Sequence, residues 1–95
     1  MIDTPYRPVE MSPAERHKFC RKARADRMAY EAASQLDLRQ LDTAARLARD
    51  AVALVGPDRL AFWLRHYATM QFNVAVGVVD AFLRRVLPAF AAASY

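Results

Sequence analysis

The fold depends most on residues 58–87, which read DRLAFWLRHYATMQFNVAVGVVDAFLRRVL. In an uninterrupted helix, the bulky apolar residues of this range would cover an arc of roughly 200°, about twice the stripe of an ordinary surface helix. The remaining stripe is polar and includes His66, Asn73 and Asp80. A helix that is apolar over more than half of its circumference needs neighbours on two sides. The sequence therefore predicts one helix of roughly 45 Å that packs on its own chain and on a second copy.

We accordingly expect a homodimer whose interface is the apolar arc of this helix. The residues expected at the interface are Leu64, Tyr67, Gln71, Val74, Val78 and Phe82. Gln71 is the polar exception within the arc, where an amide is costly unless it is paired. Either its side chain reaches water at the edge of the helix, or it meets its symmetry mate and determines the register of the dimer.

Two helices are predicted upstream of this range. Ser12-Pro13-Ala14-Glu15 combines a capping serine, a proline in the first turn and a glutamate that can close a capping box, which predicts a helix over about 13–34. Leu36-Asp37 then interrupts the pattern, and apolar residues spaced three and four apart predict a second helix over about 38–55. Gly56-Pro57 is the stop signal of that helix, since glycine favours a helix end and proline prevents continuation.

The connection at Gly56-Pro57 is short, so the helices at 38–55 and 58–87 are expected to form an antiparallel hairpin. The predicted fold is all-α: this hairpin plus the basic N-terminal helix, assembled as a dimeric helical bundle. We expect a single helical domain over 12–95, preceded by a flexible arm at 1–11. The composition agrees with this class, because only two of 95 residues are glycine and alanine, leucine and arginine dominate.

The composition also predicts where the protein acts. Cys20 is the single cysteine, so no intramolecular disulfide can form, and the first ten residues contain no apolar signal-peptide core. The longest uncharged stretch, 66–79, is too short and too polar to span a bilayer. We expect a cytoplasmic protein with no membrane association.

The sequence lacks the usual arrangements of catalytic and metal-binding residues. His17 and Cys20 are three residues apart, but His66 is the only other histidine, and a structural zinc site needs four ligands. No histidine has a serine or cysteine and a carboxylate in a recognisable setting, and no glycine-rich loop could hold a phosphate. We therefore expect no enzymatic activity, no cofactor and no metal.

The N-terminal helix is the candidate binding element. Six lysine and arginine residues lie between Arg16 and Arg27. Their charges surround the helix, and no helix-turn-helix signature follows, which favours a protein-binding face over a nucleic-acid-binding one. The residues expected to contact a partner are Phe19, Arg24, Arg27 and Tyr30, because aromatic and arginine side chains are the usual anchors of interfaces.

The C-terminal half resembles the TraM-type antiactivators of bacterial quorum sensing. The resemblance covers Trp63-Leu64, Met70-Gln71, the apolar run 74–82 and Val86-Leu87-Pro88. It implies a small helical dimer that binds a LuxR-type transcription factor and blocks its action, with no chemistry and no cofactor. The sequence departs from that family by the additional break at Leu36-Asp37.

The resulting prediction is a non-enzymatic helical regulator that binds and inhibits a protein partner such as a LuxR-type transcription factor. Two alternatives remain from the residues themselves. One is a small basic DNA-binding regulator that uses the Arg16–Arg27 segment. The other is a structural assembly subunit. The sequence names neither the partner nor the pathway.

Overall fold

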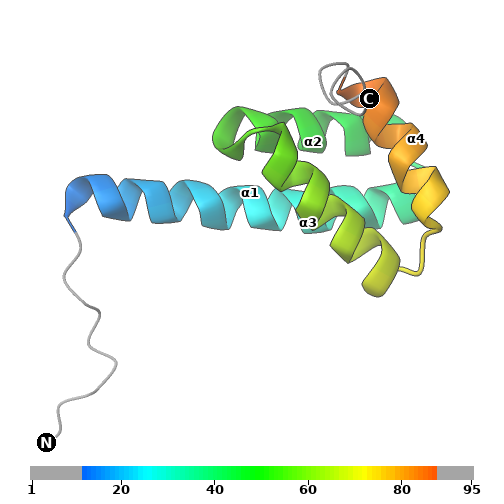
Figure 1. Cartoon of the computed structure of the whole chain (residues 1–95), viewed down its shortest axis with the longest axis horizontal. Coiled ribbons are helices and arrows are strands. Elements are labelled where there is room, and N and C mark those ends of the chain that lie inside the picture. Colours follow the sequence, from blue (N-terminus) through cyan, green and yellow to red (C-terminus); the bar gives the residue numbers. More distant parts are fainter. Residues whose placement is uncertain (1–11, 88–95) are drawn as a thin grey trace, which may run out of the picture.

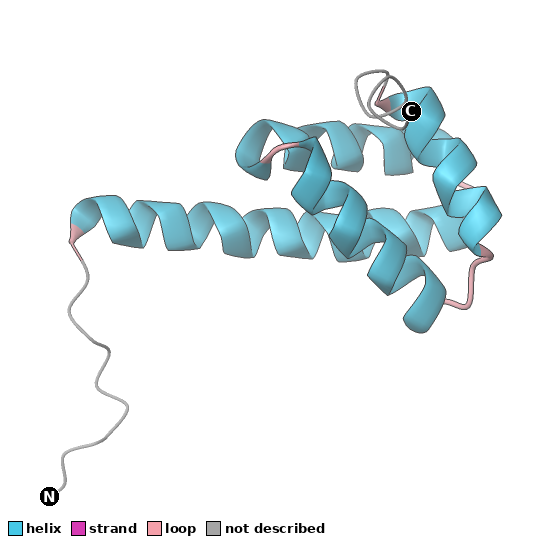
Figure 2. Cartoon of the chain, in the orientation of Figure 1, coloured by secondary structure: helices cyan, strands magenta, loops and turns pink. Residues whose placement is uncertain are grey.

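The computed structural model describes residues 12–87. Four helices lie within this range: α1 (Pro13–Asp37), α2 (Leu41–Val55), α3 (Pro57–Met70) and α4 (Val76–Val86). The rest of the described chain consists of short loops (Figure 2), so the all-α prediction is confirmed. The arm predicted at 1–11 and the C-terminal residues from 88 onward lie outside the described residues.

The predicted start of α1 is confirmed. The Ser12 hydroxyl accepts a hydrogen bond from the Glu15 N–H at 3.2 Å, and the Glu15 carboxylate accepts one from the Ser12 N–H at 2.9 Å. These two bonds satisfy backbone donors that the first turn would otherwise leave without a partner. The helix runs to Asp37 rather than about 34, because the alanines and the leucine near its end pack into the core.

The turn between α1 and α2 makes these helices neighbours. Arg39 has a φ of 64°, in the left-handed region, and its N–H donates to the Leu36 carbonyl at 3.0 Å. The Gln40 N–H donates to the Gln35 carbonyl at 2.8 Å. Together these bonds form a Schellman motif, which ends a helix and reverses the chain. Consequently α2 begins at Leu41 rather than near 38.

Helices α1 and α2 share the most extensive contact of any helix pair in the described fold. The residues of these two helices that have no exposed area are all alanines, whose size lets helix backbones approach closely. They are Ala25, Ala29, Ala32, Ala33, Ala44, Ala48 and Ala51. The predicted antiparallel hairpin of the second and third helices is therefore wrong: the hairpin is α1–α2, and α3 crosses α1 obliquely (Figure 1).

The corner between α2 and α3 explains this crossing. The stop signal at Gly56-Pro57 is confirmed, with the Gly56 N–H bonded to the Val52 carbonyl at 2.8 Å. Gly56 has a φ of 92° and a ψ of 163°, a backbone conformation that is open essentially to glycine alone. Pro57 occupies the first turn of α3, where its missing N–H costs nothing. The chain thus changes direction without an intervening loop.

The predicted single helix over 58–87 is wrong, because residues 71–75 break it. Asn73 adopts a φ of 56°, and Ala75 is extended with a ψ of 140°. The Val74 N–H donates to the Ala68 carbonyl at 2.8 Å, which closes the turn. Asparagine is among the few residues that tolerate the left-handed region, so the break lies where the sequence allows it.

This break also explains part of the wide apolar arc. The buried residues of α3 are Leu60, Ala61, Leu64 and Ala68, and those of α4 are Val79, Phe82, Leu83 and Val86. At 100° per residue each set covers an arc of about 100°, the ordinary width for a helix with one buried face. Read as one helix, the two stripes overlap and together cover about 140°. The rest of the arc of roughly 200° came from apolar residues that are only half-buried or are exposed, such as Trp63 and Met70.

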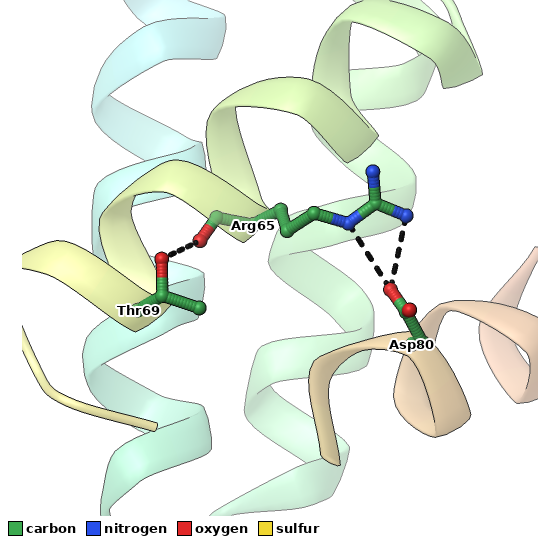
Figure 3. A network of polar contacts seen from close by, with 3 residues as sticks. All are labelled: Arg65, Thr69 and Asp80. Carbon is green, nitrogen blue, oxygen red and sulfur yellow. Dashed lines mark hydrogen bonds and ion pairs between the residues drawn. The ribbon is translucent and has the colours of Figure 1, made fainter. Parts of the chain in front are cut away.

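Helix α4 is joined to α3 by one polar contact as well as by the core. The Arg65 Nε and Nη2 atoms both donate to the same Asp80 carboxylate oxygen, at 3.1 and 3.0 Å (Figure 3). Thr69 lies one turn beyond Arg65, and its hydroxyl donates to the Arg65 carbonyl at 2.8 Å. The ion pair is partly exposed, so it contributes at most about 1 kcal/mol.

The described chain is elongated because α1 is longer than the layer that covers it. Its extents are 52 × 26 × 23 Å and its radius of gyration is 15.8 Å, whereas a compact chain of this size would have a radius of roughly 11–12 Å. Every residue from 13 to 24 is solvent-exposed, and this half of α1 extends beyond the other helices (Figure 1). We call residues 13–24 the projecting segment.

Candidate functional site

The projecting segment carries the whole net charge of the chain. It contains five basic side chains and one carboxylate, Glu15, and the chain as a whole has fourteen basic and ten acidic residues. The other parts of the sequence therefore hold nine of each and are neutral. Because an exposed charge cluster attracts oppositely charged partners over about a Debye length, this segment is where an anionic partner would be drawn.

The predicted partner-binding residues divide between this segment and the body of the fold. Phe19 lies on the projecting segment and is 61% exposed. Arg24 and Arg27 are exposed and line a shallow pocket with Met28 and Leu47. These three predicted residues thus remain accessible to a partner.

Tyr30, the fourth predicted contact, belongs to an aromatic cluster between α1 and α3. Its ring lies 5.3 Å from the Tyr67 ring, edge-on, and 5.3 Å from the Phe72 ring. The Tyr67 hydroxyl donates a hydrogen bond to the Asp26 carboxylate of α1. Edge-on aromatic pairs contribute about 0.5–1.5 kcal/mol beyond the burial of their area, so Tyr30 stabilises the crossing of the two helices, although it is 43% exposed.

The same cluster predicts a pH dependence of stability. The pKa of Tyr67 is raised above its ordinary 10.0, first because its hydroxyl donates to the Asp26 carboxylate and then because of burial. The stabilisation that this hydrogen bond gives the folded state is therefore complete below about pH 10. It is lost as the pH rises through the pKa that Tyr67 has in the folded protein. We expect Tyr67→Phe to be less stable than the wild type by roughly 1 kcal/mol at pH 8, with this difference shrinking above about pH 10.

Urea denaturation of both proteins from about pH 8 to 11 measures this difference. The control is Asp26→Asn, which keeps Tyr67 and removes the acceptor carboxylate, so tyrosinate absorbance should then develop at lower pH. A difference between wild type and Tyr67→Phe that stays constant across the range would contradict the prediction.

The six residues predicted for the dimer interface do not share one surface. Leu64 has no exposed area and Phe82 is 7% exposed, so both lie within the core of a single chain. Tyr67 and Val74 are half-buried, and Gln71 is exposed at the C-terminal cap of α3. Val78 is 51% exposed on α4. Only part of the predicted interface is therefore available to a second copy.

A basic cleft lies where the projecting segment meets the corner between α2 and α3. Its volume is about 370 Å³, and none of the described residues that line it is acidic. The side chains that define it are Lys18, Arg21, Lys22, Leu54, Val55 and Arg59. The Arg59 guanidinium lies 5.7 Å from the centre of the Trp63 ring, a cation–π contact that favours one position of this charge.

Sequence reasoning missed this cleft, although α1 carries a signal for it. The buried stripe of α1 includes Ala25, Ala29 and Ala32. Continued toward the N-terminus at helical spacing, the same stripe contains Arg21 and Lys18. The side of α1 that faces the body thus changes from alanine to cations. Arg59, by contrast, joins them only through the tertiary fold.

Other kinds of site find no support among the described residues. No group of three or more His, Cys, Asp or Glu side chains within 12–87 is placed to hold a metal ion. None of the described helices has the length and apolar character needed to cross a membrane. Cys20 is a free, exposed thiol.

The comparisons with known proteins add no relative to this description. Protein-family models, curated proteins and solved structures were compared with the chain, and none matches it.

Proposed function

We propose that this protein is a non-enzymatic regulator that binds another protein and inhibits it, and that a LuxR-type transcription factor is the partner to test first. The observation that carries the proposal is the projecting segment: about half of α1 extends beyond the other helices, every residue of it is solvent-exposed, and it carries Phe19 and the net charge of the chain. A large aromatic side chain beside arginines is the usual composition of an interface hot spot. Concentrated charge speeds the encounter with an acidic surface.

We propose further that the protein acts as a homodimer. The residues that support this proposal are the exposed part of the predicted interface, above all Val78 on α4 and Gln71 at the start of the break. Exposed aliphatic side chains on a short helix are the kind of surface that a second copy would cover. A dimer would present two projecting segments, one from each protomer.

Phe19→Ala should weaken the complex with the partner by about 2 kcal/mol, or roughly thirtyfold in Kd, because Phe19 has the size and exposure of an anchor residue. The stability of the monomer should change little, since the side chain is 61% exposed. Phe62→Ala is the matched control, because Phe62 is also a phenylalanine and is 68% exposed, but on α3. Binding is measured by calorimetry with a purified LuxR-type activator, and inhibition by a reporter gene that this activator controls.

Three outcomes of this experiment are informative. Repression of the reporter by the wild type and by Phe62→Ala, but not by Phe19→Ala, supports the proposal. If Phe19→Ala is as active as the wild type, the partner does not bind through Phe19, and the binding surface lies outside the projecting segment. If the wild type neither binds nor inhibits the activator, the LuxR-type version of the proposal is wrong.

Binding of nucleic acid is the second candidate function, and the charge of α1 favours it. A helix with five basic residues and one carboxylate on its exposed half could contact several phosphates at once. Such binding falls steeply with salt, by a factor of ten or more for a twofold to threefold rise in concentration when several phosphates are contacted. Submicromolar binding of a random DNA duplex at about 0.15 M salt would replace the protein-binding proposal by this one.

A further inference from the structure

The basic cleft gathers cations of α1 and α3 around one hollow of the surface. Lys18, Arg21 and Lys22 come from neighbouring turns of α1, and Arg59 faces them from α3, with no carboxylate among the lining residues that belong to 12–87. Cations of the same sign within one cleft repel one another, and an anion placed among them would interact with all of them. The cleft is therefore suited to a ligand that carries more than one negative charge.

The walls of the cleft restrict the chemistry of that ligand further. Leu54 and Val55 contribute apolar surface beside the cations. A cavity of about 370 Å³ is at the small end of the range for ligand pockets, and it can hold one or two side chains. Phosphates of a duplex lie on a rigid, convex surface with no apolar group that could reach Leu54 and Val55. A peptide segment can place an aliphatic side chain there and carboxylates on either side.

A second copy of the chain is a poor occupant for the same cleft. Its own projecting segment carries the same excess of positive charge, so two such segments would repel each other. The rest of the sequence has equal numbers of acidic and basic residues, so it brings no net negative charge to offset this repulsion.

We propose that this cleft binds an acidic amphipathic helix of the partner protein, with an aliphatic side chain against Leu54 and Val55 and carboxylates against Lys18, Arg21 and Lys22. This inference rests on the proposed function, in that the ligand is a protein. It adds the chemistry by which the partner is recognised. Docking of an amphipathic helix into a groove is a recurring mode of peptide recognition, and leucine anchors flanked by glutamates match the pattern of this cleft.

The test uses the full chain and a synthetic helical peptide with leucines at positions i, i+3, i+4 and i+7 and glutamates beside them. The cleft variant combines Lys18→Gln, Arg21→Gln and Lys22→Gln. The control variant combines Arg46→Gln, Arg49→Gln and Arg84→Gln, which removes the same charge from exposed positions elsewhere. Glutamine is a good helix former, and circular dichroism checks that both variants keep their helix content.

The cleft variant should bind the peptide at least about tenfold more weakly than the wild type, since three charge contacts are lost, and the control variant should change Kd less than threefold. Two changed peptides, with alanine for leucine or glutamine for glutamate, should each bind more weakly. If both variants lose the same peptide affinity, the effect comes from net charge alone, and the proposal is overturned. Failure of the wild type to bind the peptide saturably would also overturn it, as would tighter binding of a random DNA duplex through the same residues.

The result is separable from the test of the proposed function. If a LuxR-type activator is inhibited equally by the wild type and by the cleft variant, the protein-binding function holds and the cleft inference fails. If the peptide binds the cleft as expected but the activator is neither bound nor inhibited, the recognition chemistry holds and the choice of partner fails.

Discussion

Leu64→Ala should lower the free energy of unfolding by about 3–4 kcal/mol, the cost of deleting buried carbon atoms and leaving a cavity. Leu64 has no exposed area and lies in the core with Leu60, Val79 and Leu83. A small domain has only about 5–15 kcal/mol of stability in total, so the variant should unfold at a much lower urea concentration. Far-ultraviolet circular dichroism during urea denaturation measures the change.

The control for this prediction is Met70→Ala, since Met70 is 70% exposed near the end of α3 and should change stability by no more than about 0.5 kcal/mol. The loss in Leu64→Ala should also be the same at protein concentrations that differ tenfold. A loss that appears only at high concentration would place Leu64 in the dimer interface, as the sequence pattern suggested, rather than in the core of each chain.

Val78→Asp should weaken the proposed dimer by about 3 kcal/mol, or roughly a hundredfold in its dissociation constant, because a carboxylate placed in a packed interface loses its water without gaining a partner. The monomer should fold normally. Val78 is 51% exposed, and it lies in the first turn of α4, where a negative charge interacts favourably with the helix dipole. Sedimentation velocity at micromolar concentration distinguishes dimer from monomer.

Val76→Asp is a closely matched control for Val78→Asp. Both valines are 51% exposed in the first turn of α4, but at 100° per residue they point to nearly opposite sides of the helix. Phe82→Asp is unsuitable, because Phe82 is 7% exposed and the change would unfold the chain. A wild-type protein that sediments as a monomer, or equal effects of the two aspartates, would refute a dimer formed through Val78.

Several elements could be predicted because their causes are local. The start of α1 is determined within four residues, since Ser12 and Glu15 satisfy each other's backbone N–H groups. The end of α2 depends on Gly56 and on the proline that follows it. Gly56 has a φ of 92°, which glycine adopts readily because it has no Cβ. Residues 16–27 contain many cationic side chains and few bulky apolar ones, which indicates an exposed helix. The structure places nearly all of these residues at the surface.

Other features are decided only when the helices pack. Apolar periodicity reports that a face is buried, but it does not report which element covers it. The apolar pattern of 58–87 is therefore the same for one helix against two partners and for two helices that turn at Asn73. Tyr67 and Asp26 are 41 residues apart in sequence, and Arg59 reaches the cleft from another helix. Local sequence determined the helices and their charge, whereas the crossing of α3 over α1 determined which side chains meet, because contacts between distant residues exist only in the packed chain.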